Sequence, residues 1–154
     1  MSKIKKYRQG EVIFNQMSSC DGVYIIANGL VSISTEHQGK RLELAVLGKG
    51  SMFGEMAVID LQTRSASAMA LQATEIVQVD ACEFQANLHT LPLWSQLLIQ
   101  MLVRRLRAAD EQLMKLQGLD GTVPAPLYPV DEEESIIVQT KDLDAEQIAR
   151  DFKE

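Results

Sequence analysis

A short stretch of the chain combines residue types that could bind an anion. Residues 54–57 read as a tight turn that opens a short helix, and Arg64 follows ten residues after Gly54. The first amide groups of a helix have no intrahelical partner, so they form a ready anion site. An arginine adds a charge-assisted hydrogen bond to a phosphate oxygen. The Glu55 carboxylate would repel a phosphate and suits a hydroxyl donor. The stretch therefore favours a ligand with a phosphate next to a sugar hydroxyl.

Two simpler interpretations stay open. Arg64 could be a solvated turn residue, because a Gly-Glu pair with an arginine ten residues later is common by chance. Glu55 and Arg64 could also form a structural ion pair in a domain that binds no ligand.

The composition indicates one domain. The chain has 154 residues, 46% of them hydrophobic, which suits one core and is too short for two ordinary domains. No apolar run approaches the roughly eighteen residues of a membrane span, and no signal-like leader opens the chain. Cys20 and Cys82 have no CxxC spacing, so we expect reduced thiols. We therefore expect a soluble cytoplasmic protein without a membrane partner.

Charge is unevenly distributed along the chain. Residues 1–117 contain twelve Lys and Arg against eleven Asp and Glu, whereas residues 118–154 contain three against ten. Nucleic-acid binding needs a basic face that displaces counterions. A helix-turn-helix also needs two full helices with basic contacts, which the acidic, proline-containing tail does not offer. We expect no nucleic-acid partner.

Residues 11–80 predict short β-strands separated by turns. Asn28-Gly29 marks a hairpin turn, and the one helical interruption covers residues 54–61. Many short, evenly spaced strands indicate a β-sandwich or β-roll. We expect strands at residues 11–14, 23–27, 31–35, 41–47, 67–71 and 74–79.

A helical region follows the strands. Residues 82–90 form a short helical pattern, and a long helix is predicted over residues 92–117, with its proline acceptable in the first turn. Leu98, Met101 and Val103 widen the apolar face of the first half of this helix. That half is therefore expected to pack on the chain's own β-domain.

The second half of the long helix carries a narrower apolar stripe. Its apolar residues recur with gaps of three and four, which is a heptad seam, and charged residues flank it. We expect this seam to meet a second copy in a two-fold homodimer. The periodic pattern starts at Ile99, and the residues expected at the dimer contact are Leu102, Leu106, Ala109, Leu113 and Leu116.

The remainder of the chain predicts a tail. Gly118 is expected to end the long helix. Residues 121–134 carry three of the four prolines and read as a linker, residues 135–140 could form a strand, and residues 142–153 have helical periodicity. We divide the chain into a domain of residues 1–117 and an acidic tail of residues 118–154.

The order of these motifs resembles the cyclic nucleotide-binding domain family, the sensor module of catabolite activator protein and of the protein kinase A regulatory subunit. The resemblance covers residues 7–117 and lacks a DNA-binding domain. It implies a mainly β fold with α: an antiparallel β-roll or jelly roll of about eight short strands, a short helix in the phosphate segment and a long C-terminal helix. The motifs that carry it are Gly10-Glu11-Val12-Ile13-Phe14, Val23-Tyr24-Ile25-Ile26 with Gly29 and Val31, Phe53 to Ala68, and Arg104-Arg105-Leu106.

The resemblance also implies roles within the segment from Phe53 to Ala68. The amide groups of the turn and short helix would cradle a cyclic phosphate, Glu55 would accept from the ribose 2′-hydroxyl, and Arg64 would bind the phosphate. Ser65 would add a hydroxyl or amide contact. The implied binding residues are Phe53, Gly54, Glu55, Met56, Ala57, Arg64, Ser65 and Ala66.

Some positions depart from the family pattern. Met17 stands where relatives usually have a turn glycine, and Thr63 replaces a common proline. Ala109 and Asp110 fall where the activator reads adenine with hydroxyl side chains. Asp110 could accept from an exocyclic amine, so it joins the candidate residues. Base identity stays open, with cyclic AMP as the family default and cyclic GMP as the other candidate.

Three functions compete. The first is a stand-alone cyclic nucleotide sensor that changes dimer or protein-partner contacts. The second is a binding-dead dimerisation or protein-interaction module of the same fold. The third, a metal enzyme on a similar barrel, is disfavoured because His37 and His89 are isolated. We expect no enzyme activity, no metal and no cofactor.

Overall fold

The computed structural model describes the fold of residues 2–120. The linker, strand and helix predicted for residues 121–134, 135–140 and 142–153 lie outside the described residues, so those expectations stay predictions.

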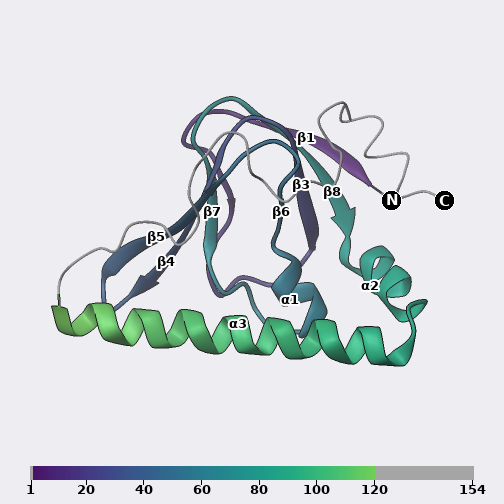
Figure 1. Ribbon diagram of the computed structural model, residues 1–154. Coiled ribbons are helices and arrows are strands. Elements are labelled where there is room, and N and C mark those ends of the chain that lie inside the picture. The colour runs from purple at the N-terminus through teal and green to yellow at the C-terminus, as the bar shows by residue number, and fades with distance from the viewer. Residues whose placement is uncertain (1, 121–154) are drawn as a thin grey trace.

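Eight strands in the described part of the chain form two antiparallel four-stranded sheets that curve around a shared core (Figure 1). In spatial order the first sheet contains β1 (Lys3–Tyr7), β8 (Thr74–Asp80), β3 (Gly22–Asn28) and β6 (Met52–Phe53). The second sheet contains β2 (Val12–Phe14), β7 (Ser67–Ala70), β4 (Val31–His37) and β5 (Lys40–Leu47). This confirms the predicted mainly β fold.

The central strand β3 is apolar without alternation because both of its faces are covered. One face joins the core between the two sheets, and the other packs with β8 under Phe84 of the helix that follows. The core between the sheets consists of Tyr24, Ile26, Val31, Phe53, Ala68 and Ile76.

Two strands were not predicted from the sequence. β1 contains three lysines and shows no apolar alternation, yet it pairs as an edge strand with β8, from Lys3 opposite Gln78 to Tyr7 opposite Thr74. Lysines are common on edge strands, where they discourage further pairing. β6 is only two residues long and is fixed by its partner β3 rather than by its own pattern.

The described residues contain three helices: α1 (Glu55–Ile59), α2 (Ala81–His89) and α3 (Leu93–Asp120). The side chain of Asp80 caps α2 by accepting from the amides of Cys82 and Glu83. α3 runs along one side of the molecule, past α1 and α2 and on to the β4–β5 hairpin (Figure 1). The prediction that Gly118 ends α3 is wrong, because the helix continues to Asp120. A glycine inside a helix weakens it by about 1 kcal/mol but does not by itself stop it.

α3 has an inner and an outer face. Val103 is buried, and Met114 reaches Thr35 of β4 with an Oγ1 to Sδ distance of 3.4 Å. The expectation that the whole first half packs on the β-domain is wrong, because Leu98 and Met101 are exposed while Val103 alone of the three is buried. The inner face repeats every three or four residues through Val103, Arg107, Asp110 and Met114.

The outer face of α3 contains the predicted seam. Leu102 is 53% exposed and Leu106 is 42% exposed. Ala109 is exposed and Leu113 is half-buried, whereas the side chain of Leu116 lies outside the described part. The seam is therefore a different face from the one that packs on the β-domain.

Candidate functional site

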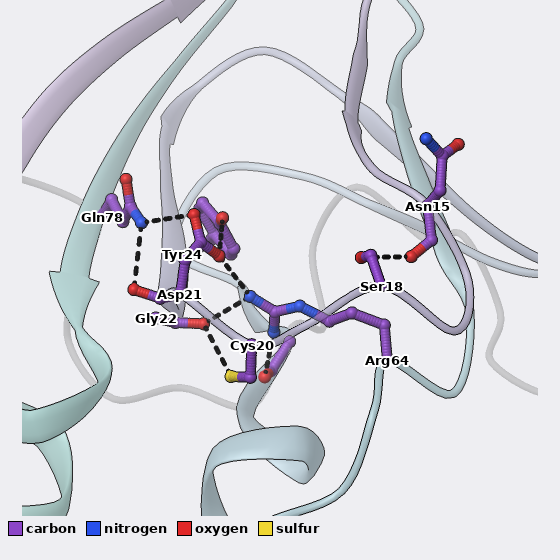
Figure 2. Close-up of polar contacts among 9 residues, drawn as sticks. Asn15, Ser18, Cys20, Asp21, Gly22, Tyr24, Arg64 and Gln78 are labelled. Carbon is purple, nitrogen blue, oxygen red and sulfur yellow. Dashed lines mark hydrogen bonds and ion pairs between the residues drawn. The ribbon is translucent and has the colours of Figure 1, made fainter.

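Arg64 is the largest fully buried side chain among the described residues, with 1% of its surface exposed. It lies in the loop between α1 and β7, and its side chain extends to the turn that precedes β3 (Figure 2). Its Nη1 donates to the Gly54 carbonyl oxygen over 2.6 Å, and its Nη2 donates to the Gly22 carbonyl oxygen and to Asp21 Oδ1 over 2.8 Å each. Arg64 is thus not a solvated turn residue.

Not every donor of this guanidinium has a partner. The Nε of Arg64 is buried and has no hydrogen-bond partner among the described residues. Buried donors are almost always paired, so an unpaired one on a cation calls for an explanation. An anionic ligand would supply an acceptor for it.

Aromatic rings cover the guanidinium. Its Cζ lies 4.2 Å from the centroid of the Phe14 ring and 5.3 Å from that of Tyr24, which is cation–π range. Phe53 stacks on Tyr24 with a centroid distance of 5.3 Å and an interplanar angle of 19°. The rings exclude water from one side of the cation and strengthen its interactions.

Asp21 is the carboxylate that pairs with Arg64. It also accepts from the Tyr24 hydroxyl over 2.7 Å and from Gln78 Nε2 over 3.0 Å. Burial alone would raise the pKa of Asp21, but the hydrogen bonds from Tyr24 and Arg64 outweigh it and hold that pKa below its usual range. Burial, followed by the hydrogen bond to Asp21 and the charge of that carboxylate, raises the pKa of Tyr24, so its hydroxyl stays a donor. Asp21 is therefore ionised at neutral pH.

Gly54 begins α1 in the left-handed conformation, with φ at 77°, and offers no side-chain cap to the helix. A Cβ on this residue would lie 2.6 Å from Arg64 Nη1. Glycine is thus required both by the backbone conformation and by the closeness of the cation.

Glu55 is the first residue of α1 and is half-buried. Burial raises its pKa, and a backbone hydrogen bond and the Arg64 charge offset that rise only in part. Within residues 2–120 the structure shows no ion pair between Glu55 and Arg64, which pairs with Asp21 instead. The interpretation as a Glu55–Arg64 structural ion pair is therefore wrong. Glu55 is a half-buried carboxylate that makes no ion pair with Arg64.

The other predicted residues lie around the site, except for Asp110. Phe53, Ala57 and Ala66 are buried and support the site, and Ser65 Oγ lies 3.8 Å from the Met56 sulfur. Asp110 is not part of the Arg64 network. It lies on α3 one turn after Arg107, where burial raises its pKa against the opposing charge of that arginine.

Sequence reasoning missed several members of the network. Phe14 and Tyr24 lay within recognised motifs but were not assigned a role in the site. Asp21 stands 43 residues before Arg64, and Gln78 is on β8, so only the fold brings them together. The Asp-Gly turn before an apolar strand was the available signal for Asp21.

The sequence model of the cyclic nucleotide-binding domain matches residues 4–90, more than half of the chain. The chain belongs to the cyclic nucleotide-binding domain family. It is 40% identical over 108 residues to the cyclic AMP receptor protein of Thermus thermophilus, covering 70% of this chain and 50% of that protein. It is 39% identical over 66 residues to the cAMP-dependent protein kinase type II regulatory subunit of Drosophila melanogaster, covering 43% of this chain and 18% of that one.

Solved structures agree with this assignment. The cAMP-bound form of the EAL enzyme Bd1971 superposes with a TM-score of 0.66 at 34% identity, over 75% of this chain and 31% of that one. The Thermus thermophilus catabolite activator protein superposes with a TM-score of 0.60 at 38% identity, over 75% of this chain and 55% of that one. The chain spans half the length of the Thermus receptor protein and less of the Drosophila subunit.

Two other features are absent from residues 2–120. No group of three or more His, Cys, Asp or Glu side chains in this range is placed to hold a metal ion. No helix in this part of the chain has the length and apolarity needed to cross a bilayer.

Proposed function

We propose that this domain binds a cyclic nucleotide at the start of α1 and acts as a stand-alone regulatory module. The observation that carries the proposal is Arg64: a fully buried cation with an unpaired Nε, bonded to the residue that opens an uncapped helix. A cyclic phosphate would accept from Nε and from the first amides of α1 once the rings that cover Arg64 move aside, because the side chain is 1% exposed without ligand. Family membership and the cAMP named for several relatives support the same ligand.

Three polar side chains among the predicted residues have roles in this proposal. Glu55 accepts a hydrogen bond from the ribose 2′-hydroxyl, and its half-buried carboxylate gains a donor when it does so. Ser65 contributes a hydroxyl to the phosphate. Asp110 lies on the inner face of α3 and accepts from the exocyclic amine of the base. Cyclic AMP is the first candidate, and cyclic GMP is the second because cGMP-bound Bd1971 is also a structural relative.

The outer face of α3 supports a homodimer. Leu102 and Leu106 are exposed apolar residues at heptad spacing, and exposed apolar side chains continue along the helix toward Leu93 and Trp94. Contiguous apolar surface of this kind marks an interaction site. Two copies of α3 packed along the seam would bury it, and nucleotide binding would change that contact or one with another protein.

The proposal assigns binding rather than catalysis to the domain. We expect no cofactor and neither nucleic acid nor a membrane as a partner, and we place the protein in the cytoplasm.

One observation favours a second candidate, the binding-dead interaction module. The charge of Arg64 is already neutralised by Asp21, and three hydrogen bonds join its guanidinium to protein acceptors. A ligand is therefore not needed to compensate the buried charge. In this case dimerisation through α3 would be the function.

The melting midpoint with each nucleotide separates the two candidates. A ligand that binds only the native state raises the midpoint by mass action. We expect a saturable rise with cyclic AMP or cyclic GMP and none with the non-cyclic 5′-monophosphates. A midpoint unchanged by both cyclic nucleotides would favour the binding-dead module.

A further inference from the structure

A buried ion pair joins α1 to α3. Asp60, the residue at which α1 ends, accepts from Arg107 Nε through its Oδ2 over 2.7 Å. The Asp60 side chain is 3% exposed and the Arg107 side chain is 16% exposed. The second carboxylate oxygen, Oδ1, accepts from the Gln62 amide over 3.3 Å. This pair lies outside the Arg64 network.

The burial of this pair sets it apart from surface pairs. Lys6 and Glu75 form a pair whose lysine is largely exposed, and such pairs contribute little. Taking Asp60 and Arg107 out of water costs more than apolar packing at the same place, so the pair is weak as a source of stability. What it does provide is a fixed geometry between two elements.

α1 is held at both of its ends by arginines. Arg64 bonds to the carbonyl of Gly54 before the first turn, and Arg107 bonds to Asp60 after the last. α1 has only five residues, so a displacement of its C-terminal end also displaces its N-terminal end. Leu61 follows in the left-handed conformation with φ at 57°, which fixes the exit of the chain next to the pair.

We propose that Arg107 is a positioning residue for the nucleotide site: through Asp60 it holds the C-terminal end of α1 in place, so that this ion pair couples nucleotide binding to the position of α3. The inference rests on the proposed function, because it concerns the same site. Arg107 does not touch the ligand in this account. It acts through α1, and because its charge also opposes the rise in the pKa of Asp110, the Asp60→Asn variant, which keeps Arg107, isolates the effect through α1.

The test is a double-mutant cycle on cyclic AMP affinity, measured by calorimetry on the full chain. Asp60→Asn and Arg107→Gln are each expected to weaken binding about 5- to 30-fold, which is the lower part of the usual range of coupling between sites. The double variant is expected to lose no more than the worse single variant, because both changes remove the same interaction. Arg107→Lys keeps a cation for Asp60 and is expected to recover part of the affinity.

The matched control is Arg105→Gln, because Arg105 is an exposed arginine on the same helix. This variant should bind cyclic AMP as tightly as the unchanged protein does.

A second readout requires no ligand. The Asp60 amide, which donates to the Met56 carbonyl oxygen over 3.0 Å, should exchange its hydrogen at least about tenfold faster in nucleotide-free Arg107→Gln than in Arg105→Gln. If the unchanged protein binds neither cyclic nucleotide, the proposed function fails, and this exchange experiment still decides whether Arg107 holds α1. If Arg107→Gln does not fold, Arg107→Lys and Asp60→Asn take its place in both measurements. Three outcomes would overturn the coupling. The first is normal affinity in both single variants, and the second is a loss of affinity in the double variant equal to the product of the two single losses. The third is unchanged hydrogen exchange at the C-terminal end of α1.

Discussion

Arg64 Nη1 donates a 2.6 Å hydrogen bond to the carbonyl oxygen of Gly54. Because a peptide group is planar and trans, this bond also fixes the direction in which the amide N–H of Glu55 points. One buried side chain thus supplies the cation of the candidate site and fixes the orientation of the helix start beside it.

Adding a methyl group at Gly54 should displace Arg64. Gly54 and Gly10 have nearly the same φ, 77° and 79°, but a Cβ at Gly10 would meet nothing within 4 Å. Gly10→Ala therefore reports the cost of the left-handed backbone alone, and Gly54→Ala adds the clash with Arg64 Nη1. We expect Gly54→Ala to lower the free energy of unfolding by roughly 2 kcal/mol more than Gly10→Ala, as overpacking usually does. Equal losses in urea unfolding would show that Arg64 moves aside freely.

Glu55→Gln should stabilise the free protein and weaken nucleotide binding. Burial raises the pKa of Glu55, so the ionised carboxylate costs folding free energy once the pH exceeds its unfolded pKa of about 4.3. The variant should therefore melt at a higher temperature than the unchanged protein at pH 7, and the gap should close below about pH 4. Glu36→Gln, at an exposed position, is the control for the loss of one charge. A lower melting temperature at pH 7 with unweakened binding would contradict the role given to Glu55.

Asp21→Asn should have the opposite pH dependence. The pKa of Asp21 is lowered in the folded state, so its contribution is fully present above the unfolded value of about 3.9 and is lost as the pH falls through the folded value. We expect the variant to lose roughly 1 kcal/mol of unfolding free energy at pH 7, since the introduced amide would still offer Arg64 a neutral acceptor and Asp21 is half-exposed. Unfolding measured at pH 7 and then at successively lower pH checks this. A difference that stays constant as the pH falls well below about 3.9 would mean that the carboxylate charge is not what matters.

Leu106→Glu should separate the two copies of a dimer without unfolding either one. Leu106 is 42% exposed within one chain, so a charge there is tolerated in the monomer but not in a packed seam. Sedimentation equilibrium should give twice the chain mass for the unchanged protein and the single mass for the variant. The exposed neighbour Arg105, changed to Gln, controls for a net charge lowered by the same one unit. A monomeric unchanged protein at every concentration would contradict the dimer.

The sequence predicted the parts of the fold and site that depend on local pattern. The six predicted strands and the helix at Glu55 are present, and Gly54 and Arg64 are in contact as the segment around them indicated. Met17, noted as standing in the place of a turn glycine, does adopt a positive φ of 65°.

The parts that were missed depend on contacts between distant segments. Asp21 becomes the partner of Arg64 only after β3 and the loop before β7 are brought together, and no local pattern records this. The burial of Asp60 against Arg107 likewise needs α3 to lie across α1. Leu98 and Met101 were assigned to the inner face because the sequence pattern of an apolar residue is the same whether it packs on its own domain or on a second chain.

Calorimetric titration of cyclic AMP and cyclic GMP into the unchanged protein tests the central claim most directly. The account predicts one site per chain with a micromolar or tighter dissociation constant for at least one of the two nucleotides. It also predicts a strong loss of that affinity in Arg64→Lys, whose single point charge cannot replace the Nε donor and the three Nη hydrogen bonds. The absence of binding heat for both nucleotides at several temperatures, with the protein folded, would contradict it.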